Sequence, residues 1–208
     1  MAPFTFARSP AELAETRYVQ SHIVAHPEYC RLAEHDLVER YLRGRCQVFA
    51  HSLLSVHGYR VEFLWDRQSK RSEGPRCLIH AYCVRPDGSL VDVRGRVSHQ
   101  EIELESEISD PETVAMSKSA LLKLFKSRPL TRPDRREMLI CKNFIERNAD
   151  VYVLGERRLT ALADLSHEEH SRLNSVVKNK IDEYIAQYRA EGLTTGVHPP
   201  HNLQEGRQ

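Results

Sequence analysis

The stretch Cys77-Leu-Ile-His-Ala-Tyr-Cys-Val-Arg-Pro-Asp-Gly-Ser-Leu-Val-Asp-Val-Arg94 decides the fold of this chain. Two segments rich in β-branched and aromatic residues flank Pro86-Asp87-Gly88, a pattern typical of a β-hairpin. Proline and aspartate suit the middle of a type I turn, and glycine suits the left-handed position after it, so we expect a three-residue loop. Such a loop pairs Arg85 with Ser89, Val84 with Leu90 and Tyr82 with Asp92.

This register places two polar side chains together. His80 and Asp92 lie on the same face of the hairpin and diagonal to each other, close enough for an imidazole and a carboxylate to meet. A loop one residue longer or shorter would turn Asp92 to the opposite face, because side chains alternate along a strand. The predicted contact therefore depends on the length of the loop.

The segment upstream of the hairpin predicts a helix that begins at a cysteine. Apolar residues recur at helical spacing from Cys46 to His57, and Gly58 stands where a left-handed terminal residue is favoured. Tyr59-Arg-Val-Glu-Phe-Leu-Trp65 then predicts a strand. Cys46 lies in the first turn of the helix, where unpaired backbone N–H groups and the positive end of the helix dipole favour a thiolate.

These segments supply the groups of a nucleophilic site. Cys46 is the candidate nucleophile. His80 is the candidate imidazole that lowers the pKa of the thiol and later protonates a leaving amine, and Asp92 is the carboxylate that fixes the tautomer of the imidazole. The backbone N–H of Cys46 or of Gln47 is a candidate donor to the oxyanion of an acyl intermediate.

Residues 43–95 also resemble a known family. GRCQVFAHSLLSVHGYRVEF looks like the nucleophile segment of the transglutaminase-like branch of the papain-like cysteine enzymes, in which Gly-x-Cys opens a helix that ends in Gly before a strand. HAYCVRPDGSLVDVRG resembles the partner segment, in which His-Ala-aromatic begins one strand and an Asp lies on the next. The resemblance implies an α+β fold with the nucleophile helix packed on an antiparallel sheet. It also implies Cys-dependent acyl transfer at a glutamine or peptide amide, with Cys46, His80 and Asp92 in the three roles.

The rest of the chain predicts further helices around this core. Residues 151–154 predict a short strand, and residues 29–42, 111–126 and 134–148 predict helices. Ser9-Pro10 predicts the start of a helix over 10–26, which His26-Pro27 ends. Ser166 with Glu169 forms a capping box that opens a last helix, which extends to about Ala190.

The same patterns predict the domain organisation. We expect one globular domain over residues 1–192, with a catalytic core at about 29–100 and a helical C-terminal part at about 111–190. Residues 193–208 have no apolar period and are expected to be a disordered tail.

Composition narrows the function classes. Lys and Arg number 30 against 29 Asp and Glu, so the net charge of +1 gives no global attraction to nucleic acid or to an anionic membrane. The first residues lack the apolar core of a secretory signal, and no stretch reaches the length of a membrane span. We expect a cytoplasmic protein, or one delivered to another cell without a cleavable signal. The 5 cysteines are odd in number and contain no Cys-x-x-Cys pair, which predicts reduced thiols.

The sequence predicts neither a metal nor an organic cofactor. His22 with His26, and His167 with His170, have helical spacing, but neither pair forms the His-Glu-x-x-His arrangement of zinc proteases. No glycine-rich phosphate loop is found in the sequence, which argues against a nucleotide.

Two functions remain. The first is a Cys-His-Asp amidase, deamidase, protease or transamidase that acts on a protein or peptide amide through a thioester on Cys46. The second is a non-catalytic module that binds a protein or nucleic acid through the basic region 118–136, although the absence of alternating aromatic residues argues against single-strand recognition. In that case Cys46 is a core thiol, His80 a hydrogen-bonded strand histidine, and Asp92 a partner of Arg94 or Arg96.

Overall fold

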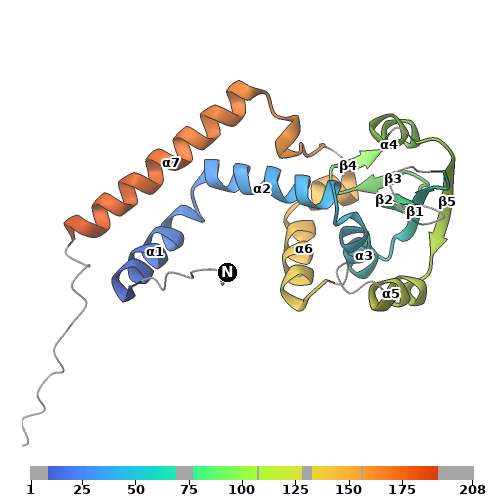
Figure 1. Cartoon of the computed structure of the whole chain (residues 1–208), viewed down its shortest axis with the longest axis horizontal. Helices are drawn as coiled ribbons and strands as arrows, with labels where there is room; N and C mark the ends of the chain where they lie inside the picture. The colour runs from blue at the N-terminus through green and yellow to red at the C-terminus, as the bar shows by residue number, and fades with distance from the viewer. Residues whose placement is uncertain (1–8, 69–76, 107, 128–132, 156, 192–208) are drawn as a thin grey trace, which may run out of the picture. The chain divides into compact units, whose positions relative to one another are not determined.

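A computed structural model describes residues 9–68, 77–106, 108–127, 133–155 and 157–191 of the 208-residue chain (Figure 1). Its backbone contacts divide the chain into two compact units. Met1–Ala33 with Ser166–Gln208 form the first, here called the helical unit, and Glu34–Leu165 form the second, the sheet unit. α2 (Pro27–Leu42) contributes residues to both units.

The helical unit is built on α1 (Pro10–Ile23) and α7 (His167–Ala190), which lie side by side in Figure 1. Both helices begin where the sequence predicts. Ser9 and Glu12 form a reciprocal capping box at α1, and the Ser166 hydroxyl accepts from the Glu169 N–H at α7. The rings of Tyr18 and Tyr188 pack at 5.1 Å between the two helices.

The sheet unit contains an antiparallel sheet with the strand order β4-β3-β2-β1-β5. The strands are β1 (Arg60–Asp66), β2 (Cys77–Val84), β3 (Leu90–Asp92), β4 (Gly95–Val97) and β5 (Pro111–Met116). The predicted hairpin is present as β2 and β3: Arg85 N donates to Ser89 O at 2.9 Å, and Val84 pairs with Leu90. Gly88 has the left-handed φ of +82° that the three-residue loop requires.

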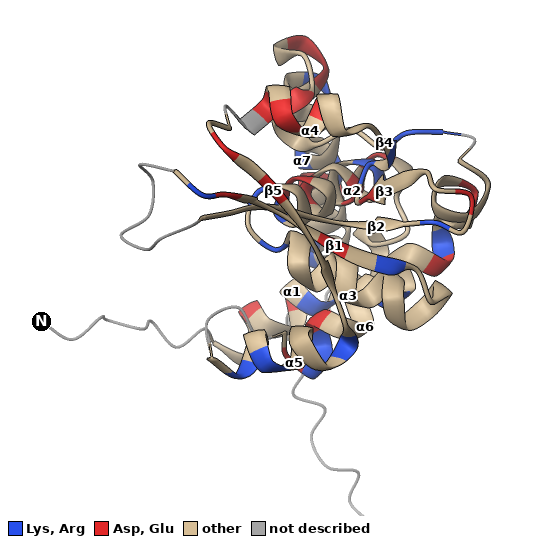
Figure 2. Cartoon of the chain, turned by 90° about the vertical axis from the view of Figure 1, so that its right-hand side faces the viewer, with Lys and Arg blue, Asp and Glu red and all other residues tan. Residues whose placement is uncertain are grey.

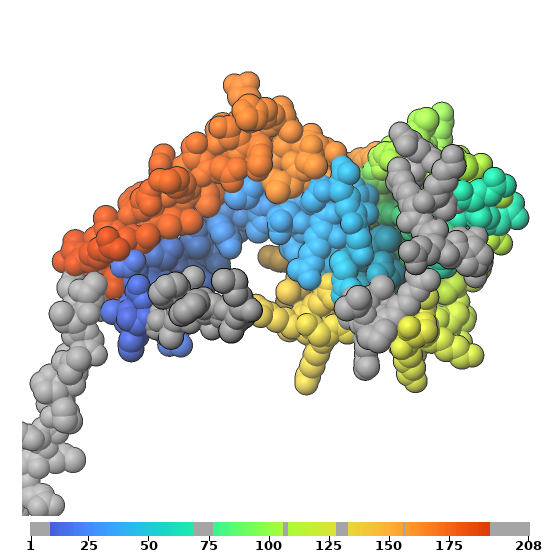
Figure 3. Space-filling model, in the orientation of Figure 1, coloured from blue at the N-terminus to red at the C-terminus, as the bar shows by residue number. Residues whose placement is uncertain are grey.

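Helices cover both faces of this sheet. α3 (Cys46–His57) and α6 (Arg135–Arg147) lie on one face, where the larger apolar core includes Phe49, Phe63 and Phe144. α4 (His99–Ser106) lies on the other face, where Ile102 packs with Leu64 and Tyr82. The predicted α+β class, with the helix that begins at Cys46 packed on an antiparallel sheet, is confirmed. Figure 3 shows α6 and the part of α2 that belongs to the sheet unit at the surface of that unit.

Residues 111–126 do not form one helix, and this prediction is wrong. The segment forms β5 and, after Ser117, α5 (Lys118–Ser127). Thr113 and Val114 are β-branched and suit a strand, and β5 adds to the free edge of β1 with Val114 opposite Phe63. Pairing with β1 is a tertiary interaction that the local spacing could not reveal.

Residues 151–154 are not a strand, so this prediction is also wrong. They belong to η2 (Asp150–Leu154), a single π-helical turn that ends at Gly155 with φ +72°. Val151 and Tyr152 are consecutive and both buried, whereas a strand would turn them to opposite faces. A 3₁₀ turn, η3 (Leu162–Asp164), completes the sheet unit.

The predicted tail, 193–208, lies outside the described residues. Within the described part of the chain, none of the helices has the length and apolar content needed to cross a membrane.

Candidate active site

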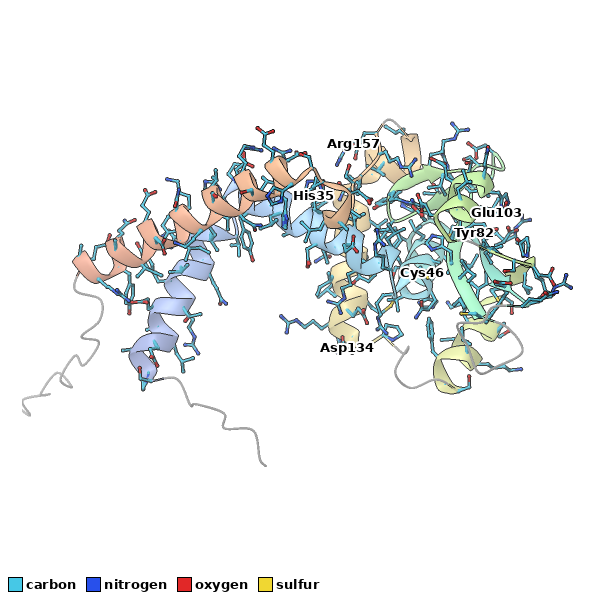
Figure 4. All side chains as sticks on the ribbon, turned by 45° about the horizontal axis from the view of Figure 1, so that its top comes forward. His35, Cys46, Tyr82, Glu103, Asp134 and Arg157 are labelled. Atoms are coloured by element: carbon cyan, nitrogen blue, oxygen red, sulfur yellow. The ribbon has the colours of Figure 1, made fainter. Side chains whose placement is uncertain are left out.

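α3 fixes the position of Cys46. Cys46 is the first residue of this helix, and Val48, Phe49 and Leu53 bury the helix against the core. The Cys46 side chain is itself largely buried, with 7% of the residue exposed. Figure 4 labels Cys46 at the point where α2 gives way to α3. A buried helix with few alternative orientations therefore presents the thiol in one place.

The first turn of α3 leaves two N–H groups near the thiol. Val48 N and Phe49 N both donate to Arg45 O, which closes the turn. The backbone N–H groups of Cys46 and Gln47 precede these two donors, at positions where the N–H groups of a helix have no acceptor within the helix. The Gln47 side chain, which is also buried, accepts at Oε1 from Cys46 Sγ at 3.6 Å. Gln47 is thus beside the thiol, with its backbone N–H as the part that suits an oxyanion.

A bulge in β2 orients His80. Leu64 pairs with His80 and Trp65 pairs with Leu78, so Ile79 is an extra residue on β2. Such a bulge re-aims the side chains beside it. His80 is buried with 4% of the residue exposed, and its Nε2 donates to Asp92 Oδ2 at 3.0 Å.

The structure brings Cys46, His80 and Asp92 together. Because Nε2 of His80 donates to Asp92, the ring nitrogen that remains for Cys46 is Nδ1, and the Cys46 side chain interacts with the imidazole by a hydrogen bond and by charge. Burial lowers the pKa of His80, but the hydrogen bonds to Asp92 and Cys46 raise this pKa by more, so it lies above the ordinary 6.5. Burial raises the pKa of Asp92, but the hydrogen bond and the charge of His80, together with those of Arg94, lower this pKa by a larger amount. The pKa of Asp92 therefore lies below its ordinary value of 3.8.

Arg94 is a second partner of Asp92. Arg94 N donates to Asp92 Oδ1 at 2.8 Å, and its guanidinium donates to Oδ2 through Nη2 at 2.7 Å. The non-catalytic alternative predicts that Asp92 pairs with Arg94 or Arg96. The contact with Arg94 is present, and Asp92 contacts His80 as well. Arg94 also pairs with Glu105 of α4 at 2.5 Å. Glu105 was not among the predicted site residues, because no local pattern in the sequence links α4 to the end of β3.

Glu137 of α6 holds the turn before Cys46, and it was not among the predicted site residues. Its buried carboxylate accepts from Arg45 Nε at 2.9 Å and again from Arg45 Nη2, and from Arg40 Nη2 at 3.3 Å. Arg45 is the residue immediately before Cys46. A glutamate on an amphipathic helix is expected to face solvent, and only the inward orientation of α6 shows that Glu137 does not.

A small charged cavity opens beside His80. It has a volume of about 230 Å³, and one wall is formed by His80 and Arg94. The remaining lining residues are Leu42, Arg43, Ile79, Ile102, Glu105 and Asp164. A reacting molecule could therefore approach the imidazole from this cavity.

The basic region 118–136 forms ordinary solvent-facing helix surfaces where it is described. Lys118, Lys123 and Lys126 are exposed on α5, whose buried face carries Leu121 and Phe125 (Figure 2). Arg135 and Arg136 are exposed at the start of α6, whereas Arg128 and Arg132 lie outside the described residues. An amphipathic helix with a charged outer face accounts for this pattern.

The described residues contain no group of three or more His, Cys, Asp and Glu side chains that could hold a metal ion. Comparison of the chain with protein-family models, with curated proteins and with solved structures finds no significant match.

Proposed function

We propose that this protein is a cysteine-dependent acyl-transfer enzyme that acts on a protein or peptide amide through a thioester on Cys46. The observation that supports this proposal best is that the His80 ring contacts two groups: its Nε2 bonds to Asp92, and its other nitrogen is left for Cys46. A raised His80 pKa favours imidazolium, which stabilises a neighbouring thiolate and can supply a proton. The resemblance of residues 43–95 to the transglutaminase-like branch of the papain-like enzymes points to the same chemistry.

The first half-reaction forms the thioester. The thiolate sulfur of Cys46 attacks the amide carbonyl carbon, and the π electrons of the carbonyl move to its oxygen. The N–H groups in the first turn of α3 stabilise this oxyanion. His80 then gives its proton to the amide nitrogen, the C–N bond breaks and an amine or ammonia leaves.

The second half-reaction releases the acyl group. Neutral His80 takes a proton from water or from a primary amine as that molecule attacks the thioester carbon, and the C–S bond breaks. Water gives hydrolysis or deamidation, and an amine gives transamidation. Asp92 keeps the ring in one orientation through both halves because its carboxylate is held by Arg94 as well.

Alkylation of the thiols tests the nucleophile. Iodoacetamide at pH 6.5 is expected to modify Cys46 on the order of tenfold faster than Cys30, because an ordinary thiol is almost fully protonated there. Cys30 is exposed, so a rate set by access alone would reverse the order. His80→Ala should slow the labelling of Cys46 and leave Cys30 unchanged. Equal, slow labelling of all the thiols would reject the proposal and favour the non-catalytic module.

Intact mass identifies the fate of the thioester. Incubation with candidate proteins is expected to give a gain of about one dalton for deamidation, a cleavage for proteolysis, or the mass of an added amine for transfer. Cys46→Ala should abolish the change. A change that persists in Cys46→Ala would show that it does not arise at this thiol.

A further inference from the structure

A continuous chain of hydrogen bonds leads from the surface of α4 to the imidazole. Both carboxylate oxygens of Glu105 accept from Arg94 Nη1, at 2.5 and 2.7 Å. Arg94 Nη2 and Nε donate to Asp92 Oδ2 at 2.7 and 3.1 Å. The same oxygen accepts from His80 Nε2 at 3.0 Å. Glu105 is therefore two side chains away from His80.

The burial of these groups makes their charges matter. The side chains of Asp92 and Arg94 are 1% and 4% exposed, so water screens their attraction weakly. Arg94 and His80 both contact the negative charge of Asp92. Without a second anion nearby, the positive guanidinium of Arg94 would disfavour protonation of the His80 ring. Glu105 supplies the balancing charge. The Glu105 side chain is 49% exposed, so solvent weakens its attraction to Arg94 without removing it.

Other charged groups near His80 have separate partners or separate roles. Cys46 reaches the ring from α3 and is the proposed nucleophile. Arg43 and Asp164 share the cavity beside His80, and Arg43 pairs with Asp164 at 3.7 Å and with Glu39 at 2.7 Å. Neither is bonded to Asp92 in the described structure. Among these described groups, Arg94 is the one that hydrogen-bonds to Asp92 besides His80, and Glu105 pairs with Arg94.

We propose that Glu105 is a positioning residue of the proposed active site, acting through Arg94 to hold the Asp92 carboxylate against His80 and to favour the protonated imidazole. Its meaning for catalysis rests on the proposed function. The coupling itself is a property of the folded chain and is measurable without substrate.

Titration of His80 by NMR, in the full chain, tests this coupling. Glu105→Gln is expected to lower the midpoint of the His80 titration by roughly half a pH unit, because one charge at this distance is lost in a partly screened setting. Glu103→Gln is the matched control. Glu103 is exposed on the same helix and carries the same charge, and Figures 2 and 4 show the acidic surface of α4 and the place of Glu103. This control is expected to leave the midpoint unchanged.

The outcomes separate the two proposals. A lower His80 midpoint in Glu105→Gln but not in Glu103→Gln supports the role of Glu105, and equal midpoints in the two variants overturn it. If Glu105→Gln fails to fold, Glu105→Ala removes the same charge with a residue that favours helix. The His80 midpoint of that variant is then compared with Glu103→Gln in the same way. The proposed function fails on a different result, an unreactive Cys46 in the unaltered protein.

Discussion

The His80 imidazole and the Asp92 carboxylate meet at 3.0 Å inside the sheet unit, although they are twelve positions apart in the chain. The three-residue loop at Pro86-Asp87-Gly88 makes this contact possible, because it puts both residues on one face of the hairpin. Asp92 then faces two cationic partners, His80 and Arg94.

Asp92→Asn is expected to lower the free energy of unfolding by about 3 kcal/mol, because it leaves the buried Arg94 without its closest anion. Urea unfolding at neutral pH measures this loss. Asp87→Asn is the matched control in the exposed hairpin turn, where Asp87 accepts from Ser89, and it should change stability little. Similar unfolding curves for the two variants would mean that the pair of Asp92 and Arg94 contributes little.

The contribution of His80 to stability is expected to fall with rising pH. The folded pKa of His80 lies above 6.5, so its stabilising charge is fully present below pH 6.5 and is lost as the pH rises through the folded pKa. The folded pKa of Asp92 is lowered from 3.8 to about 2, so its contribution is fully present above pH 3.8 and is lost as the pH falls through the folded pKa.

The pair therefore stabilises the fold most between these limits, from pH 3.8 to 6.5. Unfolding free energies measured from pH 4 to pH 9 should show the difference between wild type and His80→Gln shrinking toward alkaline pH. A difference that grows with pH would contradict the direction of the His80 shift.

Glu137→Gln is expected to slow the alkylation of Cys46 and to lower the free energy of unfolding by about 3 kcal/mol, because it leaves the Arg45 guanidinium short of a buried anion. Arg45 immediately precedes Cys46, so a looser turn is expected to move the Cys46 thiol away from the His80 ring.

Glu146→Gln is the control for this variant. Glu146 lies on the same helix, but its side chain is half exposed and pairs with Lys142 at 3.7 Å. A surface pair of this kind contributes little, so both labelling and stability should stay near wild type. If Glu146→Gln slowed labelling as much as Glu137→Gln, the contact to Arg45 would not be the cause.

Gly95→Ala is expected to destabilise the sheet unit. Gly95 has φ +103°, and a Cβ built there would lie 2.7 Å from Val151 Cγ1 and 3.3 Å from Arg157 O. Backbone strain and a steric clash therefore act together, and a loss of about 2 kcal/mol or more is expected. Gly44→Ala provides the comparison, since a Cβ at Gly44 meets nothing within 4 Å. Thermal unfolding should separate the two, and equal midpoints would contradict this account.

Several elements were predictable because their signals are local. Gly58 ends α3, Ser9 and Ser166 begin α1 and α7, and Pro86-Asp87-Gly88 sets the hairpin register. Each depends on a residue whose backbone preference or side-chain hydrogen bond acts within a few positions. That register predicted the contact between His80 and Asp92 from the hairpin alone, whereas the bulge beside His80 depends on pairing with β1.

The elements that were mispredicted depend on contacts between distant segments. Residues 111–116 form β5 by pairing with the edge of β1, and residues 151–154 form a π-helical turn that buries both Val151 and Tyr152 in the core. Local spacing favours neither outcome, since tertiary packing supplies the free energy for both.

The sequence by itself determined the helix that starts at Cys46, the hairpin and the face shared by His80 and Asp92, because propensity and side-chain alternation act over short distances. The tertiary structure alone decided that Cys46 reaches His80, that Arg94 and Glu105 hold Asp92, and that Glu137 holds the turn before the thiol. These contacts join α3, α4, α6 and the sheet, and only the packing of those elements around a common core brings charges so far apart in the chain within hydrogen-bonding distance.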